Sequence, residues 1–351
     1  MAEKIKKITG MRLFMPIVCL FIVLLVNVIR TPDFFNITLK DGQLSGWLID
    51  VINRGSELVI LAIGMTLVTA ASGGQDISVG AVMAVAAAVC CQILSGGEVS
   101  TNTLAAPIII AAIAGILVAA LCGAFNGFLV AKLNIQPMVA TLILFTAGRG
   151  IAQLVTQGQI TYVRVESYKA MGGFLGPIPT PVIFAVAAVI VAYLVLNKTA
   201  LGMYIESVGI NSHASRLIGL NSTRIKFLTY VICGALAGLA GIVASSRIYY
   251  ADANNIGLNL EMDAILAVAL GGNILSGGKF SLMGSVIGAY TIQALTTTLY
   301  AMSVPSDQLP VYKAIVVIII VVLQSPVYKK AMQNYKAKRQ SKKAVVQGGE
   351  Q

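Results

Sequence analysis

Apolar residues occur along this chain in long runs that polar and glycine-rich stretches interrupt. Most runs are close to the length that an α-helix needs to cross the hydrocarbon core of a bilayer, about 20 residues. The runs lie at residues 13–30, 54–72, 78–95, 105–131, 137–156, 181–197, 225–247, 261–275, 281–301 and 311–325. They lack the short alternating pattern of a membrane β-barrel. The pattern therefore predicts an all-α membrane protein, a polytopic helical bundle of about ten transmembrane helices.

The composition supports a membrane location. Hydrophobic residues make up 57% of the chain and charged residues 11%, against about 25% charged residues in a soluble domain. The net charge of +11 is concentrated in the segments that face the cytoplasm if the N-terminus does, as the positive-inside rule expects. The basic charge is thus a topology signal, and it does not indicate a nucleic-acid partner. The cysteines lie within apolar runs and are expected to be packing residues: Cys19, Cys90, Cys91, Cys122 and Cys233.

The same reasoning divides the chain into three parts. Residues 1–12 form a cytoplasmic N-terminus, residues 13–325 the membrane domain with a cytoplasmic loop at 198–224, and residues 326–351 a basic cytoplasmic tail at the anionic inner leaflet. The first apolar run is followed by Arg30, Pro32 and Asp33 instead of a small-residue cleavage site, which predicts an uncleaved first span. An even number of spans places both termini in the cytoplasm.

The cytoplasmic loop contains a polar stretch at 201–221 with the spacing of a short amphipathic helix. Its apolar stripe consists of Ile210, Ala214, Leu217 and Ile218, which share one helical face. Gly209 and Gly219 are expected to be the helix stops on either side. The stretch is either an ordinary helix at the membrane surface or a surface for a partner. The pattern alone leaves open whether the stripe faces that partner or the chain's own spans.

A weak internal repeat relates residues 60–89 to residues 265–293. Each copy has a span, a glycine pair, a polar patch and a second span, with Gly73-Gly74 in the first copy and Gly271-Gly272 and Gly277-Gly278 in the second. Paired apolar segments interrupted by glycine are typical of transporters with broken helices. The alternative is that both interruptions are tight turns between hairpinned spans.

The first interruption carries the most informative polar residues. Asp76 or Ser78 can cap the helix that follows, and a cap at the cytoplasmic surface is the simpler interpretation. If the interruption lies at membrane depth, its free backbone groups must instead face protein or water. It would then suit a hydroxylated solute.

A second polar set lies in the following spans and contains Asn126, Arg149 and Gln153. A charge within an apolar segment is usually paired, and an ion pair between Arg149 and Asp263 is the structural hypothesis. Small-xxx-small pairs indicate close helix packing and occur at Gly123/Gly127, Gly234/Gly238 and Gly284/Gly288.

The sequence lacks the residues that several kinds of catalytic or binding site require. His213 is the only histidine, so no catalytic triad and no histidine metal site is expected. Gly277-Gly278-Lys279 is not a P-loop, because Phe280 occupies the hydroxyl position and Asn273 the position of the first glycine. The chain is therefore not expected to bind ATP by that device, and nothing indicates a haem or a redox cofactor.

The glycine-rich interruption at 73–80, GGQDISVG, resembles the GGIDLSVG signature of bacterial carbohydrate ABC-transporter permeases of the ribose, xylose, arabinose and galactose type. Further stretches resemble the same family in the same order, at 126–127, 136–142, 147–150, 198–202 and 208–221. Stretches at 179–183, 251–257 and 260–268 are most similar to its galactofuranose branch. Gln75 departs from the signature, where Ile is usual, and Asn273 stands where a small residue is usual.

The resemblance implies that the chain is the membrane subunit of a monosaccharide importer and is not itself an enzyme. A cytoplasmic ATPase would hold ATP and Mg²⁺, an extracytoplasmic binding protein would deliver the sugar, and a second copy or a paralogous permease would complete the path, with no cofactor on this chain. The expected ATPase-coupling residues are Gly209, Ile210, Asn211, Ala214, Ser215, Leu217 and Gly219. The expected substrate-path residues are Gly73, Gly74, Gln75, Asp76, Ser78, Gly80, Asn126, Arg149 and Asn254.

Two other classes of function stay open on the residues alone. An ion-coupled secondary transporter fits the repeat and the broken helices equally well, but it needs a titratable cluster, for which Asp76, Glu261 and Asp263 are the candidates. A membrane-embedded enzyme is the third class, and the sequence lacks the catalytic clusters that such enzymes use.

Overall fold

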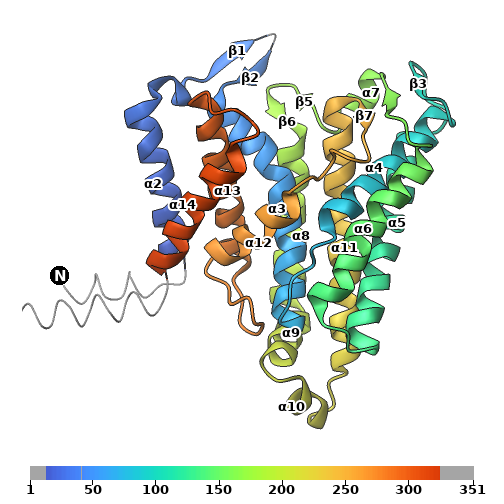
Figure 1. Ribbon diagram of the computed structural model, residues 1–351, viewed down its shortest axis with the longest axis vertical. Coiled ribbons are helices and arrows are strands. Elements are labelled where there is room, and N and C mark those ends of the chain that lie inside the picture. Colours follow the sequence, from blue (N-terminus) through green and yellow to red (C-terminus); the bar gives the residue numbers. More distant parts are fainter. Residues whose placement is uncertain (1–12, 41, 325–351) are drawn as a thin grey trace, which may run out of the picture. The chain divides into compact units, whose positions relative to one another are not determined.

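The computed structural model describes residues 13–40 and 42–324 and separates into two units that meet between Met302 and Ser303. Helices of the first unit are α2 (Phe14–Arg30), α3 (Trp47–Ser72), α4 (Val79–Ser95), α5 (Ile108–Gly127), α6 (Pro137–Val155), α7 (Glu166–Lys169), α8 (Thr180–Lys198), α9 (Leu201–Ile210), α10 (Ser212–Leu217), α11 (Ser222–Ile248), α12 (Leu260–Leu270) and α13 (Leu282–Ala301). The second unit contains α14 (Leu309–Gln324). Figure 1 shows the first unit as a bundle of helices with α9 and α10 at one end.

Short irregular helices and strands complete the first unit. A 3₁₀ turn, η1 (Pro32–Phe35), follows α2, and a π-helical stretch, η2 (Phe128–Lys132), extends α5. The strands are β1 (Thr38–Lys40), β2 (Gln43–Ser45), β3 (Ser100–Thr101), β4 (Thr161–Val163), β5 (Phe174–Leu175), β6 (Ile178–Pro179) and β7 (Tyr250–Ala251). β1 pairs with β2 and β5 with β6, both antiparallel, while β4 lies between β3 and β7. These strands lie in the loops opposite α9 and α10 (Figure 1).

Every predicted apolar run coincides with a helix, which confirms the all-α polytopic class. Among the described residues, five helices are long and apolar enough to cross a membrane, namely α3, α5 with η2, α6, α8 and α11. The helices α2, α4 and α14 are apolar but shorter. Three predicted boundaries were wrong. α3 begins at Trp47 and not near residue 54, α5 begins only after Pro107, and α12 already ends at Leu270.

α11 lies at the centre of the helix packing, against α3, α4 and α5. Its glycines allow this approach, because a Cβ at Gly234 would lie 2.9 Å from the Cα of Gly123 on α5. A Cβ at Gly238 would likewise lie 2.6 Å from the Cβ of Ala119. The predicted small-residue contacts are therefore present, and close backbone approach replaces the hydrophobic effect that soluble cores use.

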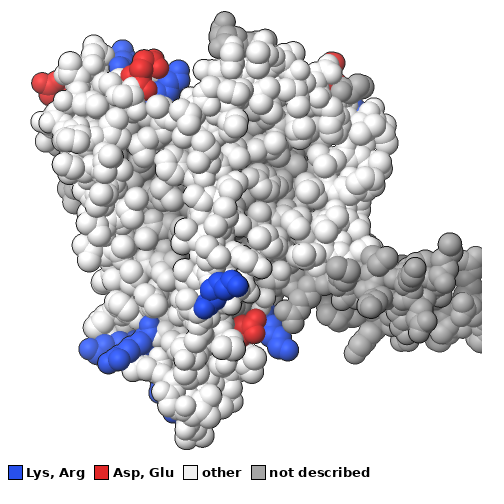
Figure 2. Space-filling model, turned by 180° about the vertical axis from the view of Figure 1, so that it is seen from behind, with Lys and Arg blue, Asp and Glu red and all other residues white. Residues whose placement is uncertain are grey.

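Charged side chains are unevenly distributed on the surface. On the face drawn in Figure 2 they lie towards two ends, and the surface between them is almost free of charge. Large apolar side chains of the bundle are exposed as well, such as Leu117, Leu121 and Leu154 at 59%, 69% and 80%. Exposed leucines and a surface with few charges are both expected of a lipid-facing protein. By contrast α3 is 94% buried within the bundle.

Candidate functional site

A buried polar cluster occupies the break between α3 and α4. The Oδ1 atom of Asp76 accepts hydrogen bonds from the main-chain N–H of Ser78 at 2.9 Å and from its hydroxyl at 2.6 Å. Asn126, reaching in from α5, donates from Nδ2 to the Ser78 hydroxyl oxygen at 2.8 Å and more weakly to Asp76 at 3.4 Å. Asp76 is 2% exposed and the other two side chains are fully buried. The cluster brings together three predicted substrate-path residues.

The cluster is not the surface cap that the sequence favoured. Ser78 occupies the N-cap position of α4, but its side chain makes no capping hydrogen bond. Asp76 does accept a main-chain N–H at the start of α4, that of Ser78, as a capping residue would, but it is buried in the bundle and not at the surface. The carbonyl oxygen of the Asn126 amide has no hydrogen-bond partner among the described residues. A buried acceptor without a partner is costly unless a ligand or water reaches it.

Glycines let the break lie directly against neighbouring elements. Gly73 ends α3 in the left-handed conformation, with φ of 68°. A Cβ at Gly74 would lie 2.6 Å from Cγ of Pro137, the first residue of α6. Further along α6, Thr141 accepts the N–H of Ile77 at 3.2 Å. The break is thus buried along α6, and it is an irregular segment inside the bundle, not a tight turn between hairpinned spans.

The first turn of α4 meets the start of α12. A Cβ at Gly80 would collide with the carbonyl oxygen of Gly257 and with Oε2 of Glu261. Glu261 is 2% exposed, and its Oε2 has no hydrogen-bond partner among the described residues. The N-terminal ends of two short helices therefore converge beside a buried carboxylate, an arrangement that favours negative charge.

Arg149 of α6 fastens the loop that leads into α12. Its Nη1 donates to the carbonyl oxygens of Ala253 at 2.9 Å and Ile256 at 2.5 Å. The carboxylates whose charge acts on it are those of Glu261 and Asp252. Main-chain carbonyl groups therefore supply hydrogen bonds to this side chain, and the ion pair with Asp263 stays a prediction.

The remaining predicted path residues lie at different places. Gln75 is 8% exposed and reaches only weakly, at 3.5 Å, to the carbonyl oxygen of Leu275. Asn254 lies in the loop before α12, where its Oδ1 accepts from Nε2 of Gln153 at 2.6 Å. That pair is exposed and lies apart from the buried cluster.

The predicted coupling stretch forms two helices, α9 and α10. Asn211 separates them and is the N-cap of α10, since its Oδ1 accepts the N–H groups of His213 and Ala214 at 3.0 Å each. Gly209 was predicted to be the helix stop, but it lies inside the last turn of α9. Gly219, with φ of 87°, follows the end of α10 as expected. The helix break therefore uses a polar cap and not the glycine.

The apolar stripe of this stretch is largely exposed. Ile210, Leu217 and Ile218 are 63%, 90% and 74% exposed. Ser215, one of the expected coupling residues, is buried and donates to the carbonyl oxygen of Asn211 at 2.9 Å. Of the two directions that the sequence left open, the stripe thus faces outward and not toward the chain's own spans.

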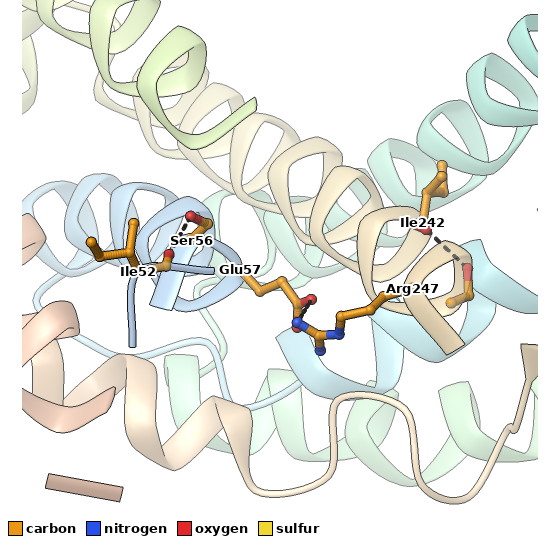
Figure 3. Close-up of polar contacts among 6 residues, drawn as sticks. Ile52, Ser56, Glu57, Ile242 and Arg247 are labelled. Atoms are coloured by element: carbon orange, nitrogen blue, oxygen red, sulfur yellow. Dashed lines mark hydrogen bonds and ion pairs between the residues drawn. The ribbon is translucent and has the colours of Figure 1, made fainter. Parts of the chain in front are cut away.

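An ion pair that the sequence did not predict joins α3 to α11. Nη1 of Arg247 lies 2.9 Å from Oε1 of Glu57, without the alignment of a hydrogen bond between those two atoms (Figure 3). The hydroxyl of the preceding residue, Ser56, donates to the carbonyl oxygen of Ile52, one turn earlier in α3, at 2.7 Å. Charges at the ends of apolar runs were the available signal, because such charges are usually paired.

Comparisons with known proteins find a family model and relatives that are all described as permeases. The family model described as "Branched-chain amino acid transport system / permease component" matches residues 47–324. The galactofuranose transporter permease protein YtfT of Escherichia coli (strain K12) is 47% identical over 310 residues, 88% of each chain. The fructose import permease protein FruF of Bifidobacterium longum (strain NCC 2705) is 39% identical over 342 residues, 95% of this chain and 94% of the relative. The ribose import permease protein RbsC of Escherichia coli (strain K12) is 33% identical over 314 residues, 88% of this chain and 92% of the relative. No solved structure matches the chain.

Proposed function

Because the chain belongs to this family of transport-system permease components, we propose that it is the membrane subunit of an ABC importer for a monosaccharide. Relatives named as permeases for galactofuranose, fructose and ribose support a sugar as the cargo. The 47% identity to the first of them favours galactose in its furanose form. Gln75, which departs from the family signature within the break, is the residue that we expect to adjust the choice of sugar.

The observation that carries the proposal is the buried cluster of Asp76, Ser78 and Asn126. Its groups are acceptors and neutral donors held by the backbone, and one amide oxygen still lacks a partner. Sugar hydroxyl groups donate and accept hydrogen bonds and need no counter-charge. The proposed path runs from the exposed Asn254 at the strand-bearing end, past Arg149 and Gly80, to this cluster. Gly73, Gly74 and Gln75 continue it beyond the cluster.

The partners follow from the same proposal. A separate ATPase, with its ATP and Mg²⁺, docks on the exposed stripe of Ile210, Leu217 and Ile218 as a helix-in-groove contact, and this chain hydrolyses nothing itself. We place the end that bears α9 and α10 in the cytoplasm together with both termini, because the excess of lysine and arginine in the two terminal segments of the sequence favours that orientation. A binding protein then meets the opposite end. A second copy or a paralogous permease completes the path.

Reconstituted uptake tests the proposal against an ion-coupled transporter. The permease is purified with the products of its neighbouring reading frames and placed in proteoliposomes that contain ATP. Uptake of radiolabelled galactose, fructose and ribose is then measured with and without ionophores. We expect uptake of one sugar to require ATP and the binding protein, and to be unaffected by ionophores. Uptake that continues without ATP and stops when ion gradients collapse would establish the secondary transporter instead.

A further inference from the structure

Three segments that are distant in sequence meet through their main chains below the polar cluster. The N–H of Gly278 donates to the carbonyl oxygen of Ala70, near the end of α3, at 2.9 Å. Gly209 of α9 lies against the same hydrogen bond. A Cβ at Gly209 would collide with the Ala70 oxygen and lie 2.6 Å from the Gly278 nitrogen. Both atoms belong to backbone, so neither can rotate away as the tip of a side chain could.

The same junction joins the two glycine breaks of the internal repeat. A Cβ at Gly73 would lie 2.7 Å from the carbonyl oxygen of Ser276, and a Cβ at Gly277 would lie 3.0 Å from the Cα of Gly73. Gly73, Gly277 and Gly278 all have positive φ, at 68°, 92° and 94°. The two breaks therefore touch each other, and α9 touches the end of α3 that leads into the first break and Gly278 of the second.

The junction lies between the exposed stripe and the buried cluster. On one side, Gly209 is two residues from Asn211, where the chain turns from α9 into α10. Cγ1 of Ile210, a residue of the stripe, lies 3.0 Å from where a Cβ of Gly278 would be. On the other side, Gly73 is three residues before Asp76. The chain thus supplies a short, continuous path of main-chain contacts between the two places.

We infer that Gly209 is the positioning residue through which a displacement of α10 reaches both glycine breaks at once. This inference rests on the proposed function and names the route by which the ATPase would act on the sugar path. Packed elements switch between discrete arrangements instead of deforming smoothly. A backbone contact with no Cβ in between has no rotamer that could absorb the movement. Gly209 therefore moves the Ala70–Gly278 hydrogen bond directly, and with it the ends of α3 and of the second break.

The test compares Gly209→Ala with Gly150→Ala in the reconstituted transporter. A Cβ at Gly150 meets nothing within 4 Å, so it controls for the added methyl group. We expect Gly209→Ala to retain the ATPase subunit on purification, and to lower sugar uptake per ATP hydrolysed by at least about fivefold. Gly150→Ala should keep the unmodified ratio. Unchanged uptake per ATP in Gly209→Ala would overturn the inference.

Hydrogen exchange on the unmodified complex provides a second measurement that does not depend on a variant. Exchange is compared between the nucleotide-free complex and the complex with a non-hydrolysable ATP analogue. We expect the rates to change together in peptides covering 70–78 and 273–280, with no change at the β1–β2 hairpin. Equal exchange of both breaks in the two states would overturn the inference even if Gly209→Ala does not assemble. If the unmodified transporter hydrolyses no ATP in response to the binding protein, the proposed function fails first.

Discussion

The ion pair between Glu57 and Arg247 predicts an asymmetric response to removal of either partner. The Glu57 side chain is 6% exposed and the Arg247 side chain 24%. Removal of the arginine, as in Arg247→Met, leaves a carboxylate that cannot reach water. Removal of the carboxylate charge, as in Glu57→Gln, leaves a guanidinium whose flexible stem can extend toward the surface. The first substitution should therefore destabilise the protein more than the second.

The distance between the two charged groups sets the size of the expected destabilisation. At 2.9 Å and an effective dielectric constant of about 20, the attraction is about 6 kcal/mol. Desolvation of several kcal/mol for each ion offsets most of it. Loss of one partner of a buried pair costs about 3–5 kcal/mol. We expect the low end for Arg247→Met, since the pair lacks hydrogen-bond alignment and Arg54 also acts on Glu57. Glu57→Gln should cost about 1–2 kcal/mol.

A double-mutant cycle measures the pair. The unfolding midpoint in detergent is recorded for Glu57→Gln, Glu57→Met, Arg247→Met and the double variant Glu57→Met/Arg247→Met. An exposed arginine on the same helix as Arg247 provides the control, Arg224→Met. The double variant should be close to the unmodified protein, because two packed apolar side chains replace two buried charges without leaving one unpaired. The reasoning is refuted if the double variant is no more stable than Arg247→Met alone, or if Arg247→Met is as mild as the control.

Three further predictions concern the cluster, the stripe and the helix contact. Asp76→Asn should lower sugar uptake by about tenfold with assembly intact, because the amide cannot replace a charged acceptor of hydrogen bonds; unchanged uptake would leave Asp76 a structural role only. Leu217→Asp should shift stability by less than about 0.5 kcal/mol, as its side chain is 90% exposed, yet reduce ATPase co-purification; a retained ATPase would contradict docking on the stripe. Gly80→Ala should destabilise the fold by about 2 kcal/mol or more, since its Cβ would collide with Gly257 and Glu261. Equal midpoints for Gly80→Ala and the unmodified protein would contradict that contact.

The helices could be predicted because their signal is local. A run of apolar residues specifies a span wherever it lies, and the structure has a helix at each run. The start of α3 was misjudged because its first two turns contain polar residues. α3 begins at Trp47 and includes Asn53 as a buried side chain, although the predicted apolar run begins only at residue 54. The ion partner of Glu57 is Arg247, nearly two hundred positions along the chain, and no local pattern indicates it.

The sequence allowed the residues of the candidate site to be named, but it did not show which of them contact one another. Asp76, Ser78 and Asn126 were all named from the sequence, but their hydrogen bonds to one another depend on how α5 packs on α4. Gly209 was misjudged for a related reason. A glycine that ends a helix and a glycine that admits a neighbouring backbone look identical in one sequence. Only the approach of Ala70 and Gly278 distinguishes the second use from the first.

The polar cluster is held by side chains, whereas the contact at Gly209 is made by backbone. Substitutions at the two places should therefore affect different steps of transport. Side chains set the hydrogen bonds of the cluster, so changes at Asp76 or Asn126 should act on sugar uptake while docking of the ATPase persists. The backbone sets the contact at Gly209, so a change there should act on coupling while the cluster keeps its donors and acceptors. Because the two glycine breaks touch, neither can move alone. A transporter built this way opens or closes both halves of its repeat in one step, since the contact that joins them has no side chain to yield.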